Sequence, residues 1–359
     1  MTRDADRRGL TLIELVLALG LASLLVLALV KLIDTSMTLW RKTEERRSQN
    51  EMSSAVTELL ASDLAAVESG PRGDLLVEWA PFDVDGDGIA TLPCLRLRLV
   101  RAASAGEIER LQVASDAPVL GQGLLEVCWA LLPASTAGAR LEWDGVLWRG
   151  VRLYGPGAGL SLLDPRFFSS SGRPASGVLE EVTGGVLWFE ALCASAGTDL
   201  SSGWESGAAR EQSFASWDAR GAARPDAERF VANEPGAAMS ALVSPLGVQR
   251  PQLPRRMRLV FEVETARGKM RRVSTTADVG IKEGALRVDD ASKLPPVGSF
   301  LLLGEEWLEL LGTSGNEARV RRGQRGTRAA EHKAGAWLRH GEPSQREVVI
   351  PSQREEWRP

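Results

Sequence analysis

The sequence has few of the residues that carry most enzyme chemistry. Among its 359 residues are only two histidines and three cysteines. The histidines, His332 and His340, lie near the C-terminus, so most of the chain has no histidine for acid–base chemistry. The motifs G-x-S-x-G and H-E-x-x-H do not occur. We therefore expect a protein that is not an enzyme.

The cysteine pattern and the overall charge argue against two further kinds of function. Cys94, Cys128 and Cys193 include no C-x-x-C pair, so at most one disulfide can form and a zinc site is not expected. The formal net charge of -4 gives no indication of a nucleic-acid partner.

One long apolar run lies near the N-terminus, over residues 10–33. The run is almost wholly apolar, and the exceptions are Thr11, Glu14, Gly20, Ser23 and Lys31. A helix of this length would measure ~36 Å at ~1.5 Å per residue, enough to cross a hydrocarbon core of ~30 Å. Arg7 and Arg8 precede the run and predict a cytoplasmic N-terminus, a single membrane span and the rest of the chain outside.

Two ordinary explanations of this run compete with a more specific one. A cleaved secretory signal would need small residues after the apolar stretch, but the helical pattern continues through Lys31 and Asp34. A plain signal anchor explains the apolar length equally well. It does not explain Glu14, because a carboxylate a few residues into a membrane span is costly and indicates a function.

The residues around Glu14 supply the specific explanation. Residues 8–15 read RGLTLIEL, which resembles the processing motif of type IV prepilins and type II secretion pseudopilins. The resemblance implies that a membrane-embedded prepilin peptidase cleaves after Gly9 and methylates the amine of Leu10. It also implies that Glu14 pairs with the N-terminal amine of a neighbouring subunit during assembly. Leu10 stands where this family usually has phenylalanine, another large apolar residue.

Beyond the membrane run the pattern predicts an α+β protein. Apolar residues recur at helical spacing up to Val67, and Gly70 with Pro71 ends the helix. We expect a long N-terminal helix, half membrane-spanning and half amphipathic, packed on an antiparallel β-sheet head. The expected parts are a leader (1–9), a transmembrane and assembly helix (10–33), its periplasmic half (34–70), a β-rich head (71–280), a small β-module (281–341) and a tail (342–359).

Within the head, apolar and charged residues alternate in two places. Leu95, Leu97 and Leu99 predict one half-buried strand. Residues 257–263 predict a second strand, which we expect to form a hairpin with residues 269–275. Residues 155–177 and 195–240 are rich in Gly, Ser, Ala and Arg, and we expect them to be mobile insertions.

Two further resemblances refine this organisation. Residues 56–64 and 253–259 resemble the helix end and the last hairpin of J-type minor pseudopilins. Residues 281–341 resemble small β-modules of phage tails and other extracellular surface proteins, which implies a contact role without chemistry. J-type pseudopilins normally lack such a module. We interpret His332, within it, as a turn or core histidine, and the polar tail after Glu342 as flexible.

One acidic loop is a candidate cation site. Asp83, Asp85 and Asp87 stand at alternate positions in a loop that also contains Gly86 and Gly88, a spacing that resembles the start of a D-x-D-x-D-G calcium loop. The twelfth position of such a loop is Cys94 here, where calcium loops have a bidentate glutamate. Calcium is the only cofactor indicated, and a solvated acidic turn stays open as the alternative.

The leading hypothesis is a minor pseudopilin of a type II protein secretion system. It would be anchored in the bacterial inner membrane with its head in the periplasm. It would contact the prepilin peptidase and other minor and major pseudopilins. The alternative is a minor pilin or adhesin of a type IV pilus. A membrane-anchored periplasmic hydrolase is a third hypothesis, which would require a nucleophile and a base in one cleft.

Overall fold

The protein is described by a computed structural model. It describes residues 12–70, 72–82, 92–113, 123–133, 145–155, 159–168, 172, 174, 177–194, 213–220, 253–264, 268–269 and 272–350. These residues form an α+β protein with one N-terminal apolar helix and mostly antiparallel sheets, as the sequence predicts. The chain divides into two compact units, Met1–Met52 and Ser53–Pro359.

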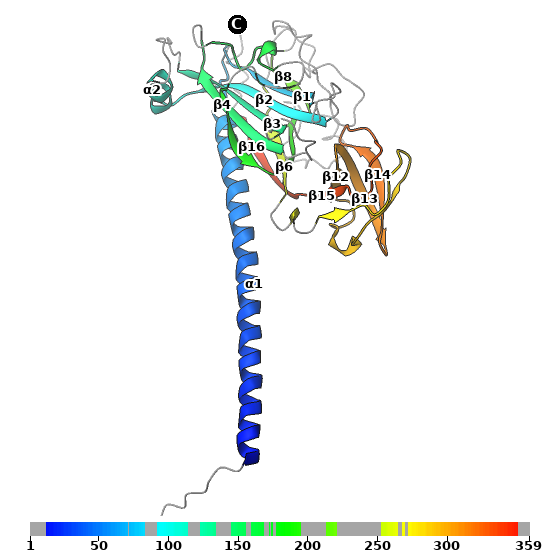
Figure 1. Ribbon diagram of the computed structural model, residues 1–359. Helices are drawn as coiled ribbons and strands as arrows, with labels where there is room; N and C mark the ends of the chain where they lie inside the picture. Colours follow the sequence, from blue (N-terminus) through cyan, green and yellow to red (C-terminus); the bar gives the residue numbers. More distant parts are fainter. Residues whose placement is uncertain are drawn as a thin grey trace, which may run out of the picture. The chain divides into compact units, whose positions relative to one another are not determined.

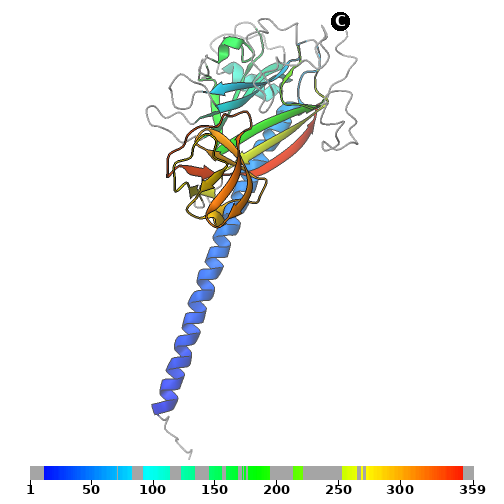
Figure 2. The same ribbon diagram turned by 90° about the vertical axis from the view of Figure 1, so that its right-hand side faces the viewer.

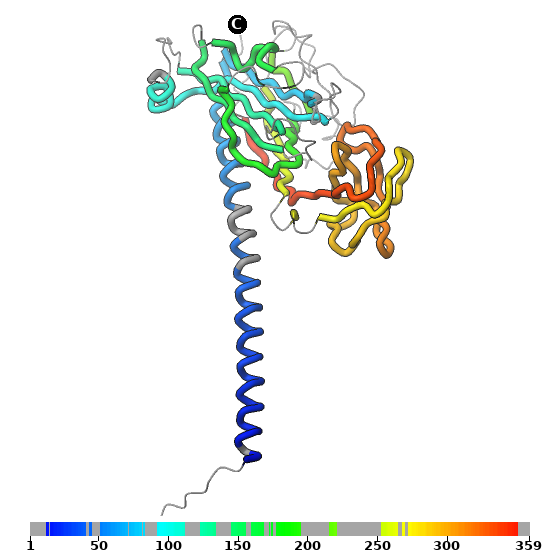
Figure 3. The backbone as a smooth tube through the Cα atoms, viewed as in Figure 1, coloured from blue at the N-terminus to red at the C-terminus, as the bar shows by residue number. Residues whose placement is uncertain are grey.

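The first unit is helical throughout its described residues. Helix α1 (Leu12–Ala65) has 54 residues and is continuous, so it is ~81 Å long (Figure 1, Figure 3). Its last residues, from Ser53 onward, belong to the second unit. There Val56, Leu60 and Leu64 are buried in the main core, at the helical spacing that the sequence indicates.

The first sheet of the head has the strand order β5-β4-β3-β2-β1-β8 (Figure 1). Its strands are β1 (Leu75–Phe82), β2 (Leu92–Ala102), β3 (Leu124–Pro133), β4 (Gly145–Leu153), β5 (Leu179–Gly184) and β8 (Trp217–Asp218). Helix α2 (Ala105–Val113) follows β2. The predicted strand at Leu95 is present as β2, but both of its faces are buried, because Arg96 and Arg98 lie under other residues.

The second sheet joins strands that are distant in the sequence. Its order is β16-β9-β6-β7, with β6 (Val186–Ala194), β7 (Ser213–Phe214), β9 (Arg256–Val263) and β16 (Glu342–Val349). The predicted hairpin of residues 257–263 with 269–275 is wrong, because β9 pairs with β16 and β6 instead. The expectation of a flexible tail from residue 342 is wrong for 342–349, since these residues form a full strand along β9.

The third sheet is a small barrel, called the barrel below. Its strands are β10 (Val273–Ser274), β11 (Ala285–Arg287), β12 (Phe300–Leu303), β13 (Glu306–Ser314), β14 (Glu317–Gln324) and β15 (Trp337–Arg339), in the order β10-β15-β12-β13-β14-β11. Figure 2 shows the barrel in yellow to orange. A bridge between Thr275 and Val288 joins the two outer strands and closes the sheet. The barrel has its own core, which includes Leu286, Leu301 and Leu308. It begins at β10, earlier than the residue 281 that the sequence suggests.

The two Gly- and Ser-rich stretches are partly built into the head. In the first, the 3₁₀-helix η1 (Pro165–Phe167) follows Leu162, and both Leu162 and Phe167 are fully buried. In the second, β7 and β8 extend the two head sheets. The expectation of mobile insertions is therefore wrong for these described parts, since a few apolar residues anchor them to the core.

Candidate functional site

The first part of α1 is an uncovered apolar surface. The 26-residue segment Leu15–Trp40 is long and apolar enough to cross a membrane, and no other helix among the described residues is. All of its large apolar side chains are exposed, from 49 % at Ile33 to 71 % at Leu25 and Trp40. Such a surface is stable against lipid or other apolar helices, where it is removed from water. The described residues thus contain one candidate membrane span.

The structure describes only one of the predicted site residues. Glu14 lies in the first turn of α1, although its side chain is outside the described atoms. Gly9, Leu10, Asp83, Asp85 and Asp87 lie outside the described residues. The acidic loop falls in the gap between β1 and β2, which pair directly on either side of it. No group of three or more potential ligands that could hold a metal occurs in the described residues.

A buried carboxylate that the sequence analysis missed holds the end of α1 in the head. The Asp63 side chain is only 2 % exposed. Its oxygens accept hydrogen bonds from Trp129 Nε1 at 2.9 Å and from Arg149 at 2.8 and 2.9 Å. The Nε atom of Arg101 lies 2.9 Å from Oδ1. Because these partners come from β2, β3 and β4, one carboxylate ties α1 to three strands of the first sheet.

The same cluster continues into helix α2. Arg101 also donates to Glu107, and Ser104 and Glu107 cap the helix reciprocally, with Ser104 N donating to Glu107 Oε2 at 3.0 Å. The hydrogen bond from Arg101 is the main reason that the pKa of Glu107 falls to about 2. The sequence contains the Ser-x-x-Glu pattern of a capping box at these two residues.

The outer face of the first sheet carries a buried layer of charge. Glu78 accepts from Arg98, and Arg96 lies over the ring of Phe168, 3.9 Å from its centroid. Burial lowers the pKa of Arg96. Glu126 pairs with Arg152 across neighbouring strands, 3.2 Å apart. These charges are covered and internally paired, so they present no open cleft among the described residues.

The cysteines are buried inside the head. Cys94, Cys128 and Cys193 have no disulfide between them, and each is enclosed by the core. Burial raises the pKa of the Cys94 and Cys128 thiols to about 12. A thiol at that pKa is protonated at neutral pH, so neither residue is a reactive nucleophile.

His332 lies in the barrel, where it contacts a buried carboxylate. Its Nε2 atom lies 2.9 Å from Glu306 Oε2, and Arg322 donates two hydrogen bonds of 2.6 Å to the same carboxylate. Burial would raise the pKa of Glu306, but these bonds and backbone donors outweigh it and hold the pKa at about 2. The arrangement joins β13, β14 and the loop before β15, as expected for a structural histidine.

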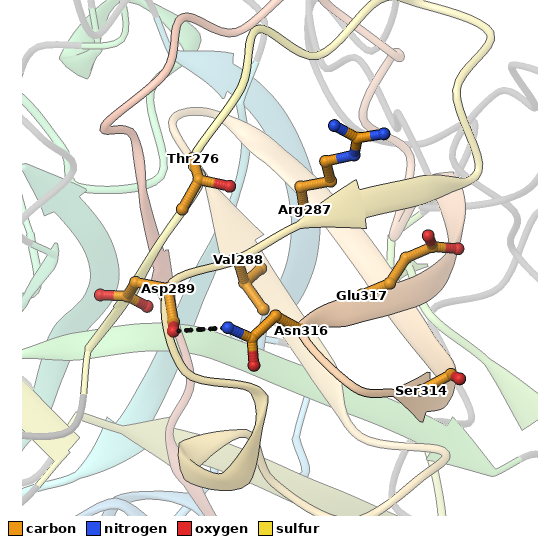
Figure 4. A pocket seen from close by; sticks show the side chains of 7 residues that line it. All are labelled: Thr276, Arg287, Val288, Asp289, Ser314, Asn316 and Glu317. Atoms are coloured by element: carbon orange, nitrogen blue, oxygen red, sulfur yellow. Dashed lines mark hydrogen bonds between the residues drawn. The ribbon is translucent and has the colours of Figure 1, made fainter.

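The barrel also has an open polar hollow of about 390 Å³. Figure 4 shows its lining: Thr276, Arg287, Val288, Asp289, Ser314, Asn316 and Glu317. Two of the polar side chains, those of Asp289 and Asn316, hold the local turns. Asn316 Nδ2 donates to the backbone oxygen of Asp289 at 3.1 Å, and the Asp289 carboxylate accepts from the backbone and hydroxyl of Ser274.

Comparison with models of known protein families and with curated proteins finds no match for this chain.

Proposed function

We propose that the chain is a minor pseudopilin of a bacterial type II protein secretion system, which helps to initiate and form the tip of the periplasmic pseudopilus. The observation that carries the proposal is the uncovered apolar segment Leu15–Trp40, which begins where the prepilin-like motif of residues 8–15 ends. A plain anchor requires only the apolar length. The placement of Glu14 in the same helix supports an assembly role, because an anchor gains nothing from a carboxylate there.

The mechanism is assembly, with no catalytic step. Prepilin peptidase removes residues 1–9 and methylates Leu10, while Arg7 and Arg8 keep the leader in the cytoplasm. Glu14 then pairs with the amine of a neighbouring pseudopilin, since a carboxylate in an apolar environment is tolerated when a cation neutralises it. The exposed leucines and valines of α1 exchange inner-membrane lipid for neighbouring helices, and the head stays in the periplasm.

A second candidate is a minor pilin or adhesin of a type IV pilus. The barrel favours it, because J-type pseudopilins normally lack such a module. A deletion strain separates the two functions. Loss of protein secretion with intact pili supports the pseudopilin, whereas loss of pili or adhesion with intact secretion supports the pilin.

The proposal is tested by the variant Glu14→Ala. We expect normal processing, because the peptidase reads Gly9, but a loss of cross-linking to neighbouring pseudopilins and of protein secretion. Glu44→Ala is the matched control, because Glu44 is an exposed carboxylate of the same helix beyond the apolar segment. An E14A protein that assembles and secretes like the wild type would contradict the assembly role.

A further inference from the structure

The barrel is inserted into a hairpin of the head. The chain leaves the second sheet at the end of β9 and returns at the start of β16, and Val263 and Glu342 are direct partners in that pairing. Both connections to the barrel therefore lie at one place. A domain attached at one place is free to swing unless further contacts hold it.

A buried carboxylate clamps the two connections together. Glu264 follows β9 and its side chain is fully buried. It accepts hydrogen bonds from Arg272 at 2.9 and 3.0 Å, on the chain entering the barrel, and from Arg339 at 3.0 Å, on the chain leaving it. Burial would raise the pKa of Glu264, but the two arginines outweigh it and lower the pKa. The outgoing chain also passes so close that a Cβ on Gly341 would lie 3.0 Å from Glu262 and Val263.

A second contact between barrel and head centres on Arg325. Its guanidinium lies 4.2 Å from the centroid of Phe300 and 4.3 Å from that of Trp307, both in the barrel. It lies 4.6 Å from the centroid of Trp188, in the head. Arg325 also donates to both carboxylate oxygens of Glu262 in β9, one at 3.0 Å. One cation thus joins three aromatic rings and a carboxylate across the boundary between barrel and head.

The backbone at Arg325 indicates that this contact is specific. Arg325 is the only residue other than glycine with a positive φ, 51°, in the described part of the chain. This conformation is costly for a side chain with a Cβ and persists where surrounding contacts impose it. The alternation of side chains along β12 and β13 also supports a contact between barrel and head. Leu301, Leu303 and Leu308 belong to the barrel core, whereas Leu302 and Trp307 belong to the core of the head.

We infer that the Arg325 contact is a latch that, with the Glu264 clamp, fixes the barrel rigidly to the head. The clamp holds the place where the two connections meet, and the Arg325 contact, beside Leu302 and Trp307 in the head core, adds a second attachment. The barrel surface is then presented in one orientation, whichever assembly the protein enters. Because the barrel has a closed sheet and its own core, loss of the latch frees it without unfolding it.

The test uses Arg325→Gly in the full chain, in detergent micelles. Glycine tolerates the positive φ, so the variant removes the latch without adding backbone strain. Arg321→Ala is the matched control, because Arg321 lies in β14 of the same barrel and pairs with Glu309 on an exposed surface, 2.7 Å away. Spin labels at Glu180→Cys in the head and Lys282→Cys in the barrel report the distance between the two parts, and both positions are exposed.

We expect a narrow distance distribution in the wild type and in R321A, and a distribution at least twofold broader in R325G. Glu262→Gln, which weakens the ion pair and keeps the aromatic stack, should give an intermediate width. Hydrogen exchange of the β13 amides should stay slow in all variants. A distribution in R325G as narrow as that of the wild type would overturn the latch. Fast exchange of the β13 amides in R325G would overturn the independently folded barrel.

Discussion

Helix α1 carries leucines in both compact units, and their surroundings are opposite. Leu25, in the first unit, is 71 % exposed, whereas Leu60, in the second unit, is fully buried in the head core. Burial of a leucine stabilises a fold by about 1.5–3 kcal/mol, so the second unit obtains its stability from within the chain. The first unit obtains no such stabilisation from the chain, and its leucines are suited to contacts with lipid or other subunits. One continuous helix therefore has an exposed apolar part in the first unit and a buried apolar stripe in the second.

The largest loss of stability is expected from a substitution of Asp63, in the second unit. The variant Asp63→Ala leaves Arg101 and Arg149 without their shared buried carboxylate, which should destabilise the second unit by about 3–5 kcal/mol. Urea unfolding of the full chain in detergent micelles measures this loss. Glu58→Ala is the control, because Glu58 is an exposed carboxylate in the same part of α1. Equal stabilities of the two variants would show that Asp63 does not hold the helix end.

Leu60 and Leu25 allow the buried and exposed parts of α1 to be compared directly. Leu60→Ala should destabilise the head by about 2–5 kcal/mol, because it removes buried methyl groups and leaves a cavity. Leu25→Ala should leave head stability unchanged in the same urea titration, because its side chain contacts no core residue. A loss of head stability in L25A similar to that in L60A would break the distinction between the two parts of the helix.

The acidic loop provides a third, smaller effect that is confined to the second unit. If Asp83, Asp85 and Asp87 bind calcium, the ion should stabilise the fold by about 2.7 kcal/mol when its free concentration is ~100 times the dissociation constant. Melting of the full chain with calcium and with chelator measures the difference, and Asp85→Ala should remove it. Identical melting temperatures with calcium and with chelator would leave a solvated acidic turn.

A further effect is a pH dependence of stability that originates in the barrel. The folded pKa of Glu306 is about 2, below its ordinary value of 4.5, so its contribution is complete above about pH 4.5. The melting temperature of the barrel should therefore fall as the pH falls from about 4.5 toward 2. Glu306→Gln should flatten that part of the profile and lower stability at neutral pH. An unchanged acid profile in E306Q would assign the pH dependence to other carboxylates.

Local patterns in the sequence predict much of this architecture. The apolar run predicts the start of α1, and the alternation around Leu95 and Leu259 predicts β2 and β9, because each signal lies within one element. The pairing of β9 with β16 was not predictable in this way. The two strands are separated in the sequence by the whole barrel. Strand β16 is an edge strand with mostly exposed polar residues, so its sequence predicts a flexible tail.

Asp63 and Arg325 were not predicted as important residues for a similar reason. Asp63 was visible as a carboxylate between Leu60 and Leu64, but its partners lie 38 to 86 positions away, from Arg101 to Arg149. The sequence signal at Arg325 is weaker, because a turn arginine next to glycine is ordinarily solvated. Both residues act through contacts that only the folded chain brings together.

If the exposed part of α1 is a processed assembly helix, as we propose, the N-terminus of the mature protein reveals it. Mass spectrometry of the protein purified from membranes should find a chain that begins at Leu10 and carries one added methyl group on its amine. A Gly9→Val variant should keep residues 1–9, because the peptidase reads the glycine. A mature chain that begins beyond residue 25 would show ordinary signal cleavage and contradict the account.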